Sequence, residues 1–229
     1  MTIHTFFTEE ERKTINEAVT NAEKGTSAEI VPVLTDASGA YDRAEDTFGV
    51  VLAVGTVSLV WLFFQDVDWD AAWSTTDNPI LRYNLLYVIV TMVVTFIIGS
   101  ALASKFWFIR HLFTAKAEMN DCMRRGAERA FHVHNLSKTE GATGILIYIS
   151  LFERMVYVLG DSAISEKLTD KDFGEVKDAI IKGFKDGKRC DGLCDGIKLC
   201  GEKLSEHFPI KEDDVDELSN ELIIFEQNL

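Results

Sequence analysis

The sequence predicts one α/β domain that is interrupted by a two-helix membrane hairpin. Two runs without Asp, Glu, Lys or Arg, residues 48–64 and 85–103, are 17 and 19 residues long. As helices, both approach the ~30 Å thickness of bilayer hydrocarbon. Removing residues 44–112 leaves about 160 of the 229 residues, which suffices for one domain. Short apolar runs and amphipathic helical patterns in that remainder predict its α/β class.

The charges around the two runs predict their orientation. The connector, residues 65–84, carries a single basic residue, Arg82, whereas several Lys and Arg residues follow the second run. By the positive-inside rule both termini lie in the cytoplasm, the connector lies outside, and the protein spans a plasma (inner) membrane twice. A buried helix of a soluble protein is the alternative for either run. Neither run offers an ionisable group to a transport pathway, so we expect an anchor.

Small residues recur every four positions on both runs. Such stripes let two helix backbones approach closely, so we expect these residues to form the contact between the spans. They are Gly49, Ala53, Thr91, Thr95, Gly99 and Ala103.

The composition narrows the function classes. A net charge of −14 and a pI of about 4.8 argue against nucleic-acid binding, which requires a basic surface. Clustered carboxylates could instead hold a divalent cation. No basic stretch followed by an apolar core opens the sequence, so we expect no cleaved signal peptide. The four cysteines fall on the predicted cytoplasmic side, where thiols stay reduced.

A helix and a strand are predicted before the hairpin. Thr8 and Glu11 have the spacing of a capping box, and the helix that they begin ends at Gly25. Residues 28–35 form a strand in which Pro32 favours an edge position or a bulge. A turn follows over residues 36–40, and a helix is expected to run from Tyr41 into the first span.

The chain after the hairpin alternates helical and β patterns. The second span is expected to continue as a helix to about residue 134 and so enter the domain directly. Residues 144–150 and 155–160 are short apolar strands joined as a hairpin. A short helical turn (162–169) and two helices, from about 170 to 187 and from 193 to 208, follow. The acidic tail, residues 211–229, is expected to be peripheral.

Several segments resemble the TPM domain, a family named for thylakoid, photosystem-repair and receptor-auxiliary proteins. The resemblance lies in residues 26–33, 141–158, 161–168, 184–188 and 191–193, in that order. It implies an αβα sandwich around a small mixed sheet. It is greatest to bacterial membrane members with a hairpin inserted after the first strand. Some relatives bind calcium, some are described as acid phosphatases, and others assist the assembly of membrane complexes. The better-known relatives differ in having an exported domain that is anchored at one end.

With this resemblance, the chain divides into four segments. Residues 1–43 are the first part of a cytoplasmic TPM-like domain, and residues 44–112 are the hairpin with its external connector. Residues 113–209 are the second part of the domain, and residues 210–229 are the acidic tail.

Four carboxylates are candidate ligands for Ca²⁺ or Mg²⁺. Asp36 follows the first strand and Asp161 follows the third. If those strands are parallel, both side chains lie at one edge of the sheet, where α/β folds place ligands. Asp42 and Asp170 could complete an oxygen cage. The alternative is that these residues are turn and cap residues, which Asp also favours.

We expect a non-enzymatic role, in which the chain acts as an accessory subunit that binds or stabilises a membrane complex. Aromatic and apolar residues outside the spans are candidates for partner contact because such anchors dominate interface energetics: Trp69, Trp73, Ile223 and Phe225. The alternative is a phosphatase that depends on a divalent metal. No phosphate-binding loop, zinc motif or thiol-phosphatase motif supports the alternative. The cysteines are expected to be small apolar residues of a helix.

Overall fold

The computed structural model describes residues 3–64, 85–139, 141–210 and 217–226. The chain divides into two compact units. Unit 1 contains Met1–Ala40 and Lys116–Leu229, and unit 2 contains Tyr41–Ala115. Unit 2 is therefore an insertion in the chain of unit 1.

Unit 1 is built on a mixed sheet of four strands in the order β3-β2-β1-β4. These strands are β1 (Glu29–Thr35), β2 (Gly144–Ser150), β3 (Met155–Gly160) and β4 (Ile223–Ile224). β1 is parallel to both of its neighbours, whereas β2 and β3 form an antiparallel hairpin. All residues of β1 and β2 are buried. The sheet thus has covered faces, as continuous apolar strands require.

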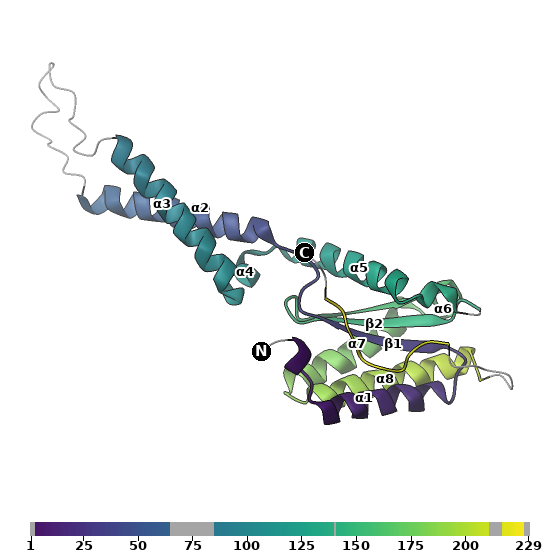
Figure 1. Cartoon of the computed structure of the whole chain (residues 1–229). Coiled ribbons are helices and arrows are strands. Elements are labelled where there is room, and N and C mark those ends of the chain that lie inside the picture. Colours follow the sequence, from purple (N-terminus) through teal and green to yellow (C-terminus); the bar gives the residue numbers. More distant parts are fainter. Residues whose placement is uncertain (1–2, 65–84, 140, 211–216, 227–229) are drawn as a thin grey trace, which may run out of the picture. The chain divides into compact units, whose positions relative to one another are not determined.

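Helices cover both faces of the sheet (Figure 1). One face packs against α1 (Glu9–Glu23), α6 (Ser162–Lys167), α7 (Asp170–Lys185) and α8 (Arg189–His207). The other face packs against α5 (Lys116–Val133) and the short 3₁₀ segment Leu136–Lys138. The predicted αβα arrangement with a small mixed sheet is confirmed.

The side chains of β1 alternate between the two faces of the sheet. Val31 and Val33 pack in the cluster that contains α5, and Ile30 and Leu34 pack in the cluster that contains α1, α7 and α8. β1 therefore has an apolar core on each side, which explains why its sequence lacks polar alternation.

Pro32 is accommodated because β4 covers only part of β1. On the β4 side of β1, the carbonyl oxygen of Leu34 accepts a hydrogen bond from the Phe225 N–H. On the same side, the Ile30 N–H donates a hydrogen bond to the Glu23 carboxylate at 2.8 Å. Pro32 lies between them, so its nitrogen faces this side also. β4 pairs only with Val33 and Leu34. No ladder bond is lost there. The predicted edge position is nevertheless wrong, because β1 pairs with β2 on one side and with β4 on the other.

The first helix begins as the capping-box pattern predicts. The Glu11 N–H donates to Thr8 Oγ1 at 3.2 Å, and the Thr8 N–H donates to the Glu11 carboxylate at 2.7 Å. Ile15 and Val19 on α1 are fully buried. Their burial fixes the helix against the sheet.

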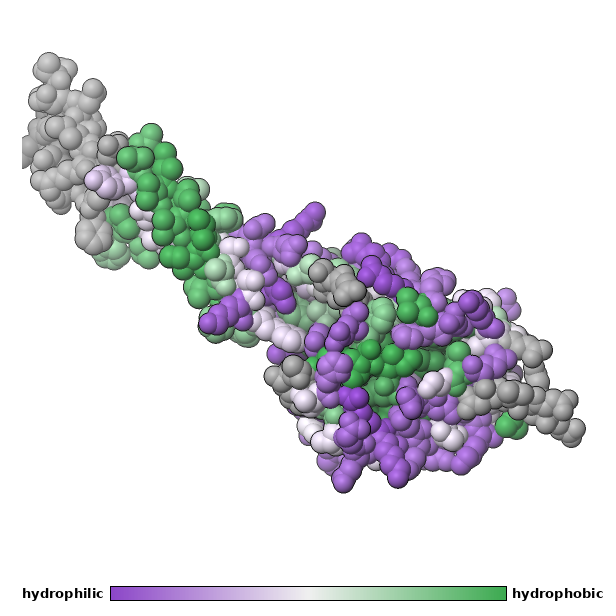
Figure 2. All heavy atoms as spheres, viewed as in Figure 1, coloured by the Kyte–Doolittle hydropathy of each residue, from purple (hydrophilic) through white to green (hydrophobic). Residues whose placement is uncertain are grey.

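Unit 2 consists of α2 (Asp42–Phe64), α3 (Leu85–Lys105) and α4 (Trp107–Phe113). α2 and α3 are long and apolar enough to cross a membrane. Figure 2 shows apolar residues gathered on the surface of these helices, whereas most of the visible surface of unit 1 is hydrophilic. The two helices pack against each other, so the structure contains the two helices of the expected hairpin.

The expected continuous helix from the second span to residue 134 is wrong. α3 ends at Lys105, Phe106 has an extended backbone (φ −106°, ψ 99°), and α4 follows as a separate helix. A second break at Thr114 (φ −83°, ψ 128°) precedes α5. Neither break contains Gly or Pro, so no residue type at these positions predicts them.

Candidate functional site

The ends of β1 and β2 meet where the chain of unit 1 leads into unit 2. Thr35 and Ser150, the last residues of these parallel strands, are paired in register. The backbone of the β2–β3 turn then bonds to the end of β1, through Leu151 N–H to Thr35 O (3.1 Å) and Phe152 N–H to Asp36 O (2.8 Å). The turn therefore lies against the segment 36–40 that precedes unit 2.

Glu153, in this turn, is a buried carboxylate with an exposed fraction of only 2%. One oxygen accepts the backbone N–H of Ser38 at 2.7 Å, and the other accepts the hydroxyl of Ser150. A buried charge is tolerated only where hydrogen bonds replace water. Glu153 thus fixes the segment after β1 to the end of β2.

Ser38 extends this arrangement to α5. Its hydroxyl lies 3.2 Å from Tyr148 Oη and donates to Met123 Sδ at 3.2 Å. Ser38 precedes unit 2 in the chain, and Met123 lies on the helix that follows unit 2. We call Ser38, Met123, Tyr148, Ser150 and Glu153 the junction cluster. It brings together the two passages of chain between which unit 2 is inserted.

The junction cluster is closed to solvent. All five residues are buried, and Tyr148 is entirely so. A catalytic acid, base or nucleophile must reach a substrate atom at hydrogen-bond distance. The cluster can therefore position backbone segments, but its carboxylate and hydroxyls cannot meet a substrate in this conformation.

An exposed acidic edge lies beside this cluster. Partial burial, followed by the nearby Glu226 carboxylate, raises the pKa of Asp36 above its usual range. Glu226 itself pairs with His4 at 2.7 Å, with both side chains largely exposed. An exposed pair of this kind stabilises a fold by less than about 1 kcal/mol.

The expectation that Asp36 and Asp161 lie at one edge of the sheet is wrong. β3 runs antiparallel to β2, and β2 runs parallel to β1, so Asp161 lies at the opposite end from Asp36. There the Asp161 N–H bonds to Gly144 O at 2.9 Å, at the start of β2. Its carboxylate accepts the Ser162 N–H at 2.6 Å and caps α6. Asp161 therefore acts as a cap residue.

The other two predicted ligands each begin a helix. Asp170 is the first residue of α7, and Asp42 is the first residue of α2 in unit 2. Among the residues that the structure describes, no group of three or more His, Cys, Asp or Glu side chains could hold a metal ion. The predicted four-carboxylate cage is not formed within unit 1.

The C-terminal segment, predicted to be peripheral, is docked on the sheet. Ile223 pairs with Val33 in β4, and the Phe225 N–H donates to Leu34 O at 2.8 Å. Both side chains are half-buried and pack against the α5 side of the core. Part of their apolar surface is thus used within the chain, and their contact with a partner stays a prediction. The other candidates for partner contact, Trp69 and Trp73, lie outside the described residues.

The predicted packing residues lie between α2 and α3. Gly49, Ala53, Gly99 and Ala103 are buried within unit 2. A Cβ built on Gly99 would lie 2.9 Å from the Gly49 Cα, closer than real Cβ contacts allow. The two backbones therefore approach most closely where both residues are glycine. Thr91 and Thr95, further along the same stripe of α3, are half-buried.

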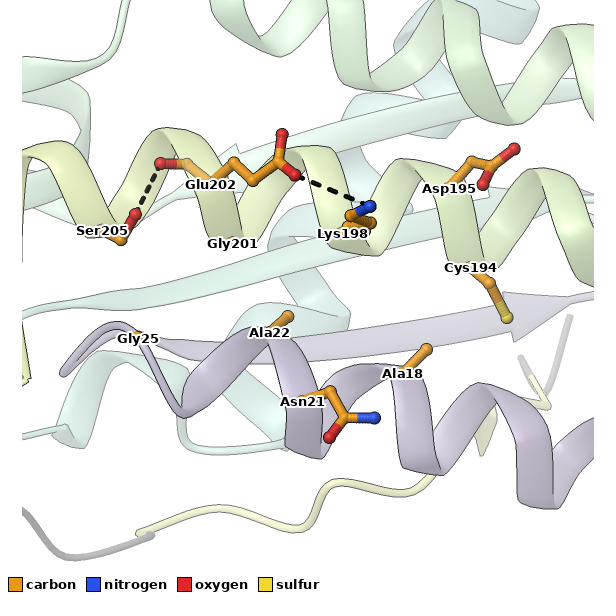
Figure 3. A pocket seen from close by; sticks show the side chains of 10 residues that line it. All are labelled: Ala18, Asn21, Ala22, Gly25, Cys194, Asp195, Lys198, Gly201, Glu202 and Ser205. Atoms are coloured by element: carbon orange, nitrogen blue, oxygen red, sulfur yellow. Dashed lines mark hydrogen bonds and ion pairs between the residues drawn. The ribbon is translucent and has the colours of Figure 1, made fainter.

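A groove of about 470 Å³ runs between α1 and α8 (Figure 3). Ala18 and Ala22 of α1 point toward α8, and Cys194 of α8 points toward α1. Burial raises the pKa of the Cys194 thiol to about 12, so that this sulfur is not a nucleophile near neutral pH. Lys198 and Glu202 form an exposed ion pair on the same helix. The groove therefore offers small side chains for packing rather than reactive groups.

The junction cluster was missed by the sequence analysis. Glu153 is one of two charged residues between Gly144 and Gly160, the other being Arg154. An acid inside an otherwise apolar hairpin is a signal that a buried hydrogen-bonded charge could be present. Ser38 gave no comparable signal, because serine is common in turns.

The comparisons with known proteins agree with this fold. Residues 109–203 match the family described as the TPM domain. A solved structure, the NMR structure of the BA42 protein from the psychrophilic bacterium Bizionia argentinensis, is similar with a TM-score of 0.57 and 23% sequence identity. The alignment covers 98% of this chain and 99% of that chain. At this identity the similarity shows the fold alone. No curated protein matches the chain.

Proposed function

Because this chain carries a TPM domain, we propose that it is a membrane-anchored TPM protein that binds and stabilises other membrane proteins at a bacterial plasma membrane. The observation that carries the proposal is the position of the apolar helices. They are inserted between β1 and α5 rather than attached at one end of the domain. Two chain passages therefore lead from the domain to the anchor.

The exposed apolar surface of unit 2 supports the membrane anchor. The candidate spans are Asp42–Phe63 and Leu85–Lys105, and only 11% and 6% of their most apolar windows are buried. A core helix of a soluble protein would be mostly buried. Lipid tails are the environment in which exposed apolar side chains carry no free-energy cost of contact with water.

The distribution of basic residues supports the orientation. Lys105, Arg110 and Lys116 follow the second span closely, whereas the connector has only Arg82. This bias favours a cytoplasmic unit 1 and an external connector.

The junction cluster supports a binding role rather than chemistry. It ties Ser38, before the anchor, to Met123, after the anchor, inside unit 1. Its carboxylate and hydroxyls are closed to solvent, so they support the fold of a binding domain rather than the chemistry of an enzyme. No arrangement of described residues favours the metal-dependent phosphatase, since Asp36 and Asp161 lie at opposite ends of the sheet.

Extraction of native membranes with a styrene–maleic acid copolymer tests this role. The affinity-tagged chain should be recovered with one or more membrane proteins in a fixed stoichiometry. In a matched variant, an unrelated two-helix hairpin replaces α2 and α3; this variant should reach the membrane but be recovered with fewer of those membrane proteins. A variant that lacks unit 1 should be recovered with none of them. Recovery of the chain alone, together with turnover of a phosphomonoester at about 1–10³ s⁻¹, would show instead that it is an enzyme.

A further inference from the structure

We propose that α4, with the preceding Phe106, lies in the headgroup region of the bilayer and binds lipid through its outer face. This inference rests on the proposed membrane anchor and adds a second kind of lipid contact to it. The surface consists of Phe106, Trp107, Phe108 and Leu112, which we call the α4 outer face.

The α4 outer face is unusually apolar for a surface in water. Phe108 and Leu112 are 72% and 66% exposed, and Phe106 and Trp107 are also exposed. Single exposed apolar residues are common, but four within seven consecutive positions form a contiguous patch that marks an interaction site. The surface continues directly from α3, whose outward residues are exposed and apolar as well.

The depth of α4 follows from its contacts with α2. Arg110 Nη1 lies 3.3 Å from Glu45 Oε1, and the Phe113 ring lies 5.3 Å from the Phe48 ring, centroid to centroid. In α2 every charged residue precedes Phe48, and none follows it. α4 therefore packs against the point where α2 changes from charged to apolar. In a membrane span, that point is the boundary between headgroups and hydrocarbon.

The length of α3 leads to the same depth. Its 21 residues rise by about 31 Å at 1.5 Å per residue, which is sufficient to cross the hydrocarbon without α4. The helix ends at Lys105, a residue that favours the interface, and the extended Phe106 then separates α4 from α3. α4 thus begins where the span is complete.

Lipid is the occupant that these observations favour. Aromatic side chains concentrate at membrane interfaces, where an apolar ring can lie below the headgroups. The ion pair between Arg110 and Glu45 is partly buried within unit 2, on the side of α4 that contacts α2. The charged side of the helix is thereby used internally, and the aromatic side remains for the bilayer.

Depth-dependent quenching of tryptophan fluorescence tests the proposal in the full-length chain. The protein has four tryptophans. In one variant Trp107 is kept and the other three are replaced by Phe. Two reference variants lack all four native tryptophans and carry V93W, in the middle of α3, or V133W, an exposed residue at the end of α5 in unit 1. Each is reconstituted into phosphatidylcholine vesicles with bromines placed either near the headgroups or near the chain ends.

We expect Trp107 to be quenched most by the shallow bromines, V93W most by the deep bromines, and V133W by neither. No quenching of V93W would contradict the membrane anchor itself, and with it the proposed function. Deep quenching of V93W with an unquenched Trp107 would overturn only the assignment of α4 to lipid. Stronger quenching of Trp107 by the deep bromines would also overturn it, because α4 would then lie in the hydrocarbon.

A second measurement covers the case in which the tryptophan-poor variants fail to fold. Nitroxide labels on W107C, V93C and V133C report the same depth order, each in a chain that keeps its other tryptophans and has its four native cysteines replaced. Collision with oxygen should dominate at V93C, and collision with a water-soluble nickel complex should dominate at V133C. An intermediate value at W107C supports the proposal, and a value equal to that of V133C contradicts it.

Discussion

Replacement of Glu153 tests whether the junction cluster holds the segment before the anchor. In E153A the Ser38 N–H and the Ser150 hydroxyl lose their acceptor while remaining buried. A buried unsatisfied donor costs about 1–3 kcal/mol, so we expect a loss of about 3 kcal/mol in the free energy of unfolding. At about 2–4 °C per kcal/mol for a chain of this size, the melting temperature should fall by roughly 6–12 °C. E153Q keeps the shape and one acceptor oxygen, whereas its NH2 group can only donate, so its loss should be about half as large.

The assay combines melting of the detergent-solubilised chain, followed by circular dichroism, with amide hydrogen exchange. Exchange at the Ser38 amide should become faster in E153A, because its acceptor is removed. E166A is the control, since Glu166 is an exposed acid on α6 of the same unit. A fall in melting temperature no larger than that of E166A, with unchanged exchange at Ser38, would refute the structural role of the cluster.

Three further predictions concern the acids and the helix contact. D161A should lower the melting temperature by roughly 2–4 °C, because the α6 cap is lost, whereas D161N should keep most of the stabilisation that the cap provides. Neither difference from wild type should change between Ca²⁺ and a chelator, and a calcium-dependent difference would show that Asp161 binds metal. Because the pKa of Asp36 is raised in the folded state, its ionisation destabilises the fold as pH rises above 3.8. D36N should therefore melt higher than wild type at pH 7.5 and lose this advantage toward pH 4; an equal advantage at both values would contradict the raised pKa of Asp36. G99L should reduce the mole fraction of SDS that unfolds the hairpin, because the added side chain meets α2. G55L is the control, because a Cβ at Gly55 meets nothing within 4 Å, and equal effects of the two variants would disprove the close contact.

Local patterns were sufficient for most of the secondary structure. The capping box at Thr8 and the paired runs of β2 and β3 depend on neighbouring residues, and both are formed as predicted. The resemblance to the TPM domain, which the match over residues 109–203 supports, also rests on ordered local segments. These features are encoded within short stretches, so the sequence alone was enough.

The candidate site could not be predicted because it depends on long-range strand order. The relation between Asp36 and Asp161 is set by the direction of β3 relative to β1, two strands that do not touch. Likewise, Ile223 pairs with Val33 across most of the chain, and two residues of strand are too few to give a pattern. The break at Phe106 accompanies packing of α4 on α2, a long-range contact that involves Glu45 and Phe48.

The most direct test of the account is the accessibility of single cysteines on the two sides of the membrane. In a chain whose four cysteines are replaced, S74C lies in the connector between the spans, and E206C is exposed at the end of α8. An impermeant thiol reagent applied to intact cells should label S74C and leave E206C unlabelled, and permeabilised cells should show both labelled. Labelling of E206C but not S74C in intact cells would contradict the proposed cytoplasmic position of unit 1, and labelling of both would contradict the proposed hairpin that crosses the membrane with unit 1 on the inside.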